Sequence, residues 1–335
     1  MATFVIAEVG VNHNGDIGLA KKLVEAASKA GANAVKFQTF KADDLATATA
    51  PKAEYQIEND GSGSQIEMLK SLELTVSEHR ELAEYCKAWD IMFLSTAFGV
   101  NELDFLLELG MTAIKVPSGE ITNLLLLEAI AEASVIKELP VYLSTGMSTL
   151  EEVEAALGVL FSRGVQKEKL TILHCVSAYP APEEQINLSA LGTLKKVFGC
   201  SVGYSDHTLG ITAAVAAVAL GAVVIEKHIT LDTNMPGPDH RASLDPEEFK
   251  SMIAAIRSCE KMLGDGVKRP QKSEYSTKDV ARRSIRAARP IKRGALITIE
   301  DIVFKRPGDG VSPMRYKEFL GTSASIDYEA GDAIQ

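Results

Sequence analysis

Two short apolar segments of this chain each end in a charged residue followed by histidine: SVGYSDH (201–207) and AVVIEKH (222–228). If both segments are strands, His207 and His228 lie at the same end of neighbouring strands. A single histidine of this kind is more often a core or rim residue satisfied by its neighbours. Two in matching positions, with carboxylates close by in the sequence, favour a divalent-metal site. The carboxylates are Asp206, Glu226 and Asp239.

The segments that must position these histidines form a repeating pattern. Strands rich in Val and Ile, alternating with amphipathic helical segments, indicate parallel pairing with both faces of the sheet buried. Eight such β/α units over residues 1–263 predict a TIM (β/α)8 barrel, and a doubly wound open sheet is the alternative. The predicted strands are 3–8, 33–38, 91–95, 112–116, 140–144, 170–175, 200–204 and 222–227.

Two regions interrupt the alternation of strands and helices. Residues 39–76 form a long insertion, and loops of this length in compact domains are usually functional or disordered. Beyond Leu263 a polar stretch over 264–280, which carries glycine, proline and lysine, predicts a linker. Residues 281–335 then predict a small module of short strands and glycine turns. Because so small a module is near the lower size limit for independent stability, we expect it to dock on a barrel.

Composition and charge exclude several classes of function. The 335 residues are 46% hydrophobic and carry a formal net charge of −10, which argues against nucleic-acid binding. No apolar run is long enough to predict a membrane span, and the opening MATFVIAEVG lacks the features of a signal peptide. The four cysteines lie far apart without a C-x-x-C pair, so we expect free thiols and a cytoplasmic protein.

Active sites of TIM barrels gather at the C-terminal ends of the strands, where this chain places several polar residues. Lys36 and Lys115 lie inside apolar strands, and a buried lysine is costly unless it is paired. Each lysine could form a structural ion pair, bind a phosphate or carboxylate, or form a Schiff base. Glu8 ends the first strand and could be a structural acceptor or a general acid or base.

These residues carry a resemblance to the sialic acid synthase family, which includes N-acetylneuraminate and legionaminate-type synthases. The module at 281–335 resembles the antifreeze-like (SAF, β-clip) domain of these enzymes, which swaps across a dimer to cover the partner's barrel. The matching segments run in order along nearly the whole chain: IAEVGVNHNGD, AVKFQTFKADDL, APKAEYQ, FLSTAF, IKVPSGEITN, LSTGMST, LHCVSAYPAP, GYSDHTLGI, EKHITLDTNMPGPDHRASLDP and KRPGDGVSPM.

The resemblance implies a role for each matching residue. His207 and His228 match metal ligands, with Mn²⁺ expected and Mg²⁺ or Co²⁺ as substitutes, and Glu8 matches the glutamate that handles water or a proton. Arg306 matches an arginine that the partner subunit delivers to the sugar. The expected phosphoenolpyruvate shell is Lys36, Thr96, Lys115, Ser118, Ser144, Ser177, Tyr179 and Ser205. The expected sugar contacts are Gln38, Tyr179 and Asp239, and Phe98 and Glu120 complete the substrate-binding set.

The resemblance also implies the reaction. Phosphoenolpyruvate would condense with open-chain N-acetylmannosamine and release phosphate by C–O cleavage, in a cytoplasmic homodimer with swapped C-terminal domains. An alternative acceptor is a 6-deoxy-2,4-diacetamido hexose, as in legionaminic acid synthesis. A pyruvate-dependent aldolase is a more distant alternative, and a non-enzymatic ice- or partner-binding protein is a third.

Overall fold

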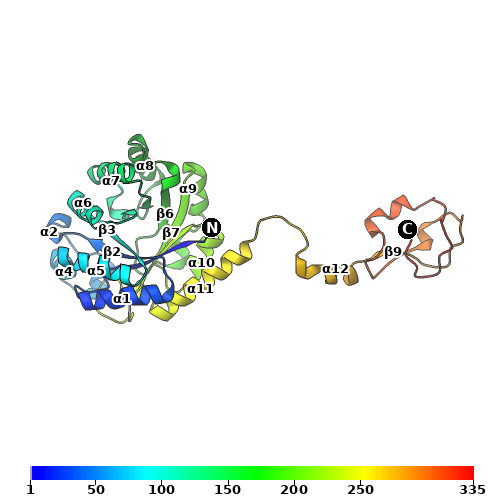
Figure 1. The fold of residues 1–335 in the computed structure, drawn as a ribbon, viewed down its shortest axis with the longest axis horizontal. Helices are drawn as coiled ribbons and strands as arrows, with labels where there is room; N and C mark the ends of the chain where they lie inside the picture. The colour runs from blue at the N-terminus through cyan, green and yellow to red at the C-terminus, as the bar shows by residue number, and fades with distance from the viewer. Residues whose placement is uncertain (1) are drawn as a thin grey trace. The chain divides into compact units, whose positions relative to one another are not determined.

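The computed structural model describes residues 2–335, which divide into two compact units. The first unit ends at Gly264, and the second is Asp265–Gln335 (Figure 1). None of the described helices is long and apolar enough to cross a membrane.

The first unit is built on an eight-stranded parallel sheet in the order β3-β2-β1-β8-β7-β6-β5-β4. The two strands at the ends of this order, β3 and β4, also contact each other, so the sheet closes into a barrel. The predicted TIM barrel is therefore confirmed. The strands are β1 (Phe4–Gly10), β2 (Ala34–Thr39), β3 (Met92–Ala97), β4 (Ile114–Val116), β5 (Val141–Ser144), β6 (Leu170–Cys175), β7 (Ser201–Asp206) and β8 (Val224–His228).

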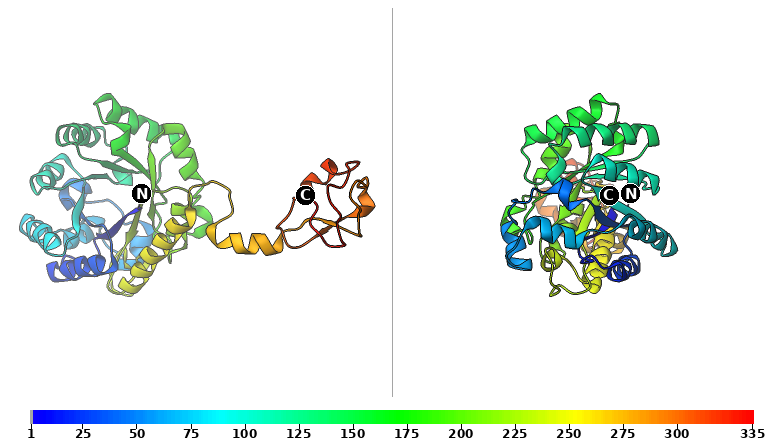
Figure 2. Two further views of the ribbon diagram at one scale, coloured as in Figure 1. Left: turned by 45° about the vertical axis from the view of Figure 1, so that its right-hand side comes forward. Right: turned by 90° about the vertical axis from the view of Figure 1, so that its left-hand side faces the viewer.

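Helices surround the barrel, as Figure 2 shows. Their apolar faces pack on the strands in one continuous hydrophobic core. Several begin at capping boxes, in which a side chain accepts a hydrogen bond from the first turn and a glutamate returns one, as at Thr149 and Glu152. The helices of this outer layer are α1 (Ile17–Ala30), α5 (Val76–Ala88), α6 (Val100–Glu108), α7 (Leu124–Lys137), α8 (Leu150–Ser162), α9 (Ala190–Phe198), α10 (Thr212–Ala219) and α11 (Pro246–Leu263).

The insertion between β2 and α5 folds into three short helices, α2 (Ala42–Leu45), α3 (Glu54–Asp60) and α4 (Gln65–Leu72). Met68 and Leu72 of α4 pack against Val11 and Phe40 in a small hydrophobic cluster separate from the main core. The insertion is therefore an ordered structure with its own apolar contacts, and it is anchored to the loop that follows β1.

The second unit has its own core around the antiparallel pair β9 (Ser284–Ala287) and β10 (Ile302–Lys305). The stretch 264–280, which we expected to be a linker, contains most of helix α12 (Tyr275–Ala281). The buried core residues of this unit are Ile285, Ala287, Ile291, Ile297, Ala324, Tyr328 and Ile334.

Candidate active site

A cavity of about 400 Å³ opens at the C-terminal ends of the barrel strands. It is bounded by the strand ends, by helices α3 and α4 of the insertion, and by the loop that follows β8. The predicted site residues that line it are Glu8, Lys36, Gln38, Thr96, Phe98, Lys115, Ser118, Ser144, Ser177, Tyr179, Ser205, His207, His228 and Asp239.

Two predicted residues are not part of this cavity lining. Glu120 lies in a short 3₁₀ turn after β4, where its carboxylate accepts a hydrogen bond of 2.7 Å from the side-chain amide of Asn123. Its substrate-binding role therefore has no geometric support. Arg306 follows β10 in the second unit, so the barrel alone does not bring it to the site.

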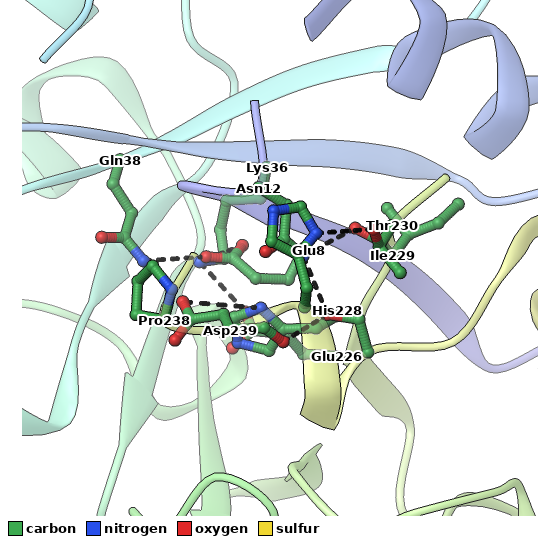
Figure 3. Close-up of polar contacts among 12 residues, drawn as sticks. Glu8, Asn12, Lys36, Gln38, Glu226, His228, Ile229, Thr230, Pro238 and Asp239 are labelled. Atoms are coloured by element: carbon green, nitrogen blue, oxygen red, sulfur yellow. Dashed lines mark hydrogen bonds and ion pairs between the residues drawn. The ribbon is translucent and has the colours of Figure 1, made fainter. Parts of the chain in front are cut away.

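The cavity lining includes a buried cluster of charges, of which Figure 3 shows Glu8, Lys36 and Glu226. The Lys36 Nζ lies 2.5 Å from Glu8 Oε2 and 3.6 Å from Glu226 Oε2. The Lys115 Nζ lies 3.7 Å from Glu226 Oε1. All four side chains are buried. Both lysines thus have carboxylate partners and also face the cavity, so the ion-pair and anion-binding interpretations apply together.

The sequence indicates Glu226 only as a carboxylate near the histidines, but in the structure its side chain lies between the two lysines. Side chains alternate along a strand, so Glu226 and His228 of β8 face the barrel interior while Lys227 faces outward. Ser205 of β7 pairs with Glu226 in the register and donates a hydrogen bond of 2.8 Å to its Oε1. Lys227 instead lies 2.9 Å from Asp206 Oδ2, in a fully buried ion pair outside the cavity.

Burial and charge act in opposite directions on these groups. Burial raises the pKa of Glu8 despite the opposing effect of Lys36. Burial alone would raise the pKa of Glu226, but Lys115 and Lys36 outweigh it and hold that pKa below its usual value. Burial would likewise lower the pKa of Lys36, but Glu226 and Glu8 raise it, so this lysine stays charged. The pKa of Lys115 is lowered, chiefly by burial.

Hydroxyl groups surround the two lysines. Lys36 Nζ donates to Thr96 Oγ1 at 3.0 Å, and the Gly146 backbone N–H donates to Ser118 Oγ at 3.0 Å. The buried Ser144 Oγ has no hydrogen-bond partner within the described structure. A buried hydroxyl without a partner is unusual in a native protein, so Ser144 has hydrogen-bonding capacity left for a ligand.

His207 and His228 lie side by side at the mouth, with ring centroids 5.5 Å apart. The His207 Nδ1 donates to the Val176 carbonyl oxygen at 2.7 Å, which leaves Nε2 as the nitrogen with a lone pair. The buried His228 Nδ1 has no hydrogen-bond partner among the described residues and lies 4.0 Å from Asp239 Oδ2. Burial lowers the pKa of both imidazoles, which keeps them neutral.

These two imidazoles fit a metal ion, because both are neutral and one buried nitrogen lacks a partner. No group of three or more histidine, cysteine or acidic side chains placed to hold a metal occurs within residues 2–335. Within the described residues, a cation at this position would therefore have the two histidines as its protein ligands, and its other positions would remain open to water or substrate.

The third side of the cavity is aromatic and polar. The Tyr179 ring lies 4.2 Å from the His207 ring and 4.9 Å from the Tyr55 ring, centroid to centroid. Gln38 Nε2 donates to Glu8 Oε1 at 3.4 Å. Burial raises the pKa of the Asp239 carboxyl to about 7. Tyr55 and Gln56 of α3 also line this side. They belong to the segment APKAEYQ of the insertion 39–76, which the resemblance led us to expect over the site, but neither residue was among the predicted site residues.

Known proteins resemble the chain along its full length. The N,N'-diacetyllegionaminic acid synthase of Campylobacter jejuni is 48% identical over 334 residues, covering 99% of each chain. The enzyme of the same name from Legionella pneumophila is 47% identical over 337 residues, covering 100% of this chain and 94% of its own. Human N-acetylneuraminate-9-phosphate synthase is 32% identical over 336 residues, covering 99% of this chain and 91% of its own.

Solved structures and family models agree with these relatives. The crystal structure of N-acetylneuraminic acid synthetase from Leptospira borgpetersenii superposes with a TM-score of 0.73 at 35% identity, covering 83% of this chain and 90% of its own. A SAF domain model matches residues 282–335, which confirms the predicted identity of the C-terminal module. A NeuB family model matches residues 23–268, and the chain therefore belongs to the NeuB family.

Proposed function

We propose that this protein is a phosphoenolpyruvate-dependent synthase of a nonulosonic acid, and that its acceptor is a 6-deoxy-2,4-diacetamido hexose. The observation that carries the reaction is the buried Lys36–Glu226–Lys115 cluster beside two neutral histidines in one cavity. The acceptor rests on identity. The two legionaminic acid synthases are 48% and 47% identical to the chain, against 32% for the human N-acetylneuraminate-9-phosphate synthase. The identities therefore favour the 6-deoxy-2,4-diacetamido hexose over the expected acceptor N-acetylmannosamine.

The lysine side of the cavity suits the donor. Phosphoenolpyruvate carries a phosphate and a carboxylate, and such anions are bound by cations and hydroxyl donors that are already fixed in position. Lys36 and Lys115 supply the charge. Ser144, whose hydroxyl has no partner, and Ser118 supply donors from neighbouring strand ends.

We propose that His207 and His228 hold a divalent cation, Mn²⁺ first among the candidates. When bound, such a cation supplies Lewis-acid polarisation of a carbonyl oxygen. The hydrogen bond from His207 to the Val176 carbonyl oxygen holds this ring in place, so that its Nε2 would be available to the cation. Exhaustive chelation should abolish turnover, and added Mn²⁺ should restore it. Full activity in the chelated protein would contradict the assignment.

The chain's own groups account for the remaining chemistry. C3 of phosphoenolpyruvate attacks the aldehyde carbon, the aldehyde oxygen takes up a proton to become a hydroxyl group, and the positive centre left at C2 takes up water. We propose that the Glu8 carboxylate accepts the proton of that water, because it lies at the cavity floor beside Lys36. The C2–O bond to phosphate then breaks as the oxygen delivered by water forms the C2 carbonyl and gives up its second proton to the leaving phosphate. Lys36 and Lys115 stabilise the negative charge of the donor and of the leaving phosphate.

We further propose a cytoplasmic homodimer in which the C-terminal unit of one subunit completes the other's barrel. The support for the cytoplasm is that Cys86, Cys175, Cys200 and Cys259 are all free thiols. The support for the exchange is that Arg306 matches the expected sugar-binding arginine but belongs to the second unit.

Phosphate release from phosphoenolpyruvate, measured with Mn²⁺ against a panel of acetamido hexoses, tests the proposal. The 6-deoxy-2,4-diacetamido sugar should give the highest kcat/KM, and N-acetylmannosamine a lower one. A preference for N-acetylmannosamine would reverse the acceptor assignment. Phosphate release with none of the sugars would overturn the reaction, and trapping of a pyruvate adduct by borohydride would favour an aldolase instead.

A further inference from the structure

Helix α3 of the insertion forms part of the wall of the cavity. Its residues Tyr55 and Gln56 line the cavity, and the Tyr55 ring packs on Tyr179 at a centroid distance of 4.9 Å. Tyr179 in turn packs on His207 at 4.2 Å. An aromatic path therefore runs from the proposed metal ligands to a helix outside the barrel.

Helix α3 does not stabilise itself in this position. It is only seven residues long, and its N-cap, Ala53, offers no side-chain hydrogen bond, although the Ala53 backbone N–H donates to Gln56 Oε1 at 2.9 Å. Isolated helices this short are unstable in water. The place of Tyr55 must therefore be fixed by contacts between α3 and the rest of the barrel unit.

Asn59 provides two of those contacts. Its Nδ2 donates to the Pro238 carbonyl oxygen at 2.7 Å, and its Oδ1 accepts from Arg241 Nη1 at 3.2 Å. Both partners belong to the loop that follows β8 and carries Asp239. One amide side chain thus joins the insertion to that loop through two hydrogen bonds.

The loop after β8 is itself held by the barrel (Figure 3). Asn12 Nδ2 donates to the Ile229 carbonyl oxygen at 2.9 Å and to Ser243 Oγ at 2.8 Å. Ser243 Oγ donates to the Asp239 carbonyl oxygen at 2.7 Å. Asn12 and Ser243 are buried, so this anchor is rigid. These hydrogen bonds connect the barrel to the loop after β8, and Asn59 connects that loop to α3.

We propose that Tyr55 contacts the acceptor sugar and helps to select it, and that Asn59 is the positioning residue that holds Tyr55 there. This inference rests on the proposed function. An acceptor whose aldehyde lies at the histidine pair extends past Tyr179, and Tyr55 is the next ring along that path. The donor-side groups Lys36, Lys115 and Ser144 lie on β2, β4 and β5, and none of them forms a hydrogen bond or ring contact with Tyr55 or Asn59 within the described residues. Tyr55 and Asn59 should therefore affect the acceptor and spare phosphoenolpyruvate.

Steady-state kinetics on the full-length protein separate the two substrates. Asn59→Ala should raise the acceptor KM about tenfold, which is the size expected from losing two hydrogen bonds, and leave the phosphoenolpyruvate KM unchanged. Tyr55→Ala should raise the acceptor KM and reduce the preference for the diacetamido sugar over N-acetylmannosamine. Asn59→Asp keeps the acceptor for Arg241 but loses the donor to Pro238, so its effect should fall between those of Asn59→Ala and wild type. The control is Ile57→Ala, an exposed position on the same helix outside the cavity lining.

Amide hydrogen exchange adds a readout that needs no substrate. In Asn59→Ala, exchange should accelerate over residues 54–61 and stay unchanged in the barrel strands. Equal rises in both KM values, or no change in the acceptor KM, would overturn the selection role while leaving the proposed reaction intact. Unchanged exchange over 54–61 would overturn the positioning role. If the wild-type protein releases no phosphate with any sugar, the proposed function fails, and the acceptor role of Tyr55 fails with it.

Discussion

Glu226 shows how one residue reconciles two requirements at the base of the cavity. Two lysines buried within one barrel repel each other, and each is costly to bury without a counter-charge. Glu226 lies within 4 Å of both ammonium groups, at 3.6 and 3.7 Å. Neither distance is as short as the 2.5 Å contact between Lys36 and Glu8. Glu226 therefore offsets the charge of both lysines, although Lys36 Nζ also donates to Thr96 and Lys115 Nζ donates to the Val116 carbonyl oxygen at 3.3 Å.

Replacing Glu226 tests this balance. Glu226→Gln removes the shared counter-charge and should destabilise the fold by about 3–5 kcal/mol, the usual effect of breaking a buried ion pair. Phosphoenolpyruvate should then stabilise the variant more than it stabilises the wild type, because its anionic groups replace the lost carboxylate. Thermal unfolding with and without phosphoenolpyruvate measures both effects.

The buried Lys227–Asp206 pair supplies the matched control. It is as buried as the Glu226 cluster but lies outside the cavity. Asp206→Asn should lower the melting temperature, and phosphoenolpyruvate should give it no extra stabilisation over wild type. If both variants gain equally from the ligand, Glu226 is not a counter-charge for the donor site.

The raised pKa of Glu8 predicts a pH dependence. A general base acts as the carboxylate, which forms as pH rises through its pKa. Because burial raises the pKa of Glu8 above the ordinary 4.5, the rising limb of kcat/KM should lie at a higher pH than for an exposed glutamate. Glu8→Gln should reduce kcat by about 10²–10⁴-fold, and its residual activity should lack that limb. A limb that persists in Glu8→Gln would assign it to another group.

At the scale of elements, the strand ends are held close together by glycine. The loop after β5 brings the Gly146 backbone against the side chains of Ser118, Ser177 and Cys175. A Cβ added at Gly146 would lie within 3.0 Å of an atom of each. Only a residue without a side chain lets these three strand ends converge on the donor site.

Substitution of this glycine should therefore damage the donor site selectively. Gly146→Ala should displace Ser118 and Ser177 and raise the phosphoenolpyruvate KM by about tenfold or more, since small misplacements of binding groups are costly. The acceptor KM should change less. The control is Gly158→Ala in α8, where a Cβ meets nothing within 4 Å and alanine should stabilise the helix by about 0.5–1 kcal/mol. Equal effects on the two KM values would argue against a local donor-site defect.

Much of the barrel could be predicted from the sequence, because each strand is a short Val- and Ile-rich run and each polar strand end is visible. The position of Glu226 required the strand register, which a single sequence leaves open. The role of Glu120 stays a prediction, since it lies in a 3₁₀ turn outside the cavity lining and its carboxylate accepts a hydrogen bond from Asn123. Tyr55 and Asn59 were missed because their positions depend on contacts with a loop nearly 180 residues away in sequence, as for Asn59 and Pro238.

At the scale of the whole molecule, an acidic protein binds an anionic donor. The chain carries a formal net charge of −10, yet the lysines of the cavity are buried and paired with nearby carboxylates. Local charges in a low-dielectric cavity act more strongly than distant surface charges screened by salt. The negative net charge is therefore compatible with an anionic donor, for which we propose Lys36 and Lys115 as the binding groups.

The division of the chain into two units has a consequence for catalysis. Arg306 belongs to the second unit, whereas Glu8 and the histidine pair belong to the first. If Arg306 binds the acceptor, Arg306→Ala should raise the acceptor KM far more than the phosphoenolpyruvate KM. This result alone would not tell whether the arginine acts on its own barrel or on a partner's.

A heterodimer of two defective subunits distinguishes these cases. One subunit carries Glu8→Gln and the other Arg306→Ala, with different affinity tags for purification. If the C-terminal units exchange, the barrel of the Arg306→Ala subunit, which keeps Glu8, receives the intact Arg306 of its partner. One of the two sites is then complete, and about half of the wild-type activity should return at low acceptor concentration. Without exchange, neither site is complete. The heterodimer of wild type with the Glu8→Gln/Arg306→Ala double variant should show the opposite pattern, with no complete site if the units exchange and one if they do not. An active second heterodimer and an inactive first would therefore place Arg306 over its own barrel, and a protein that is active as a monomer would contradict the exchange directly.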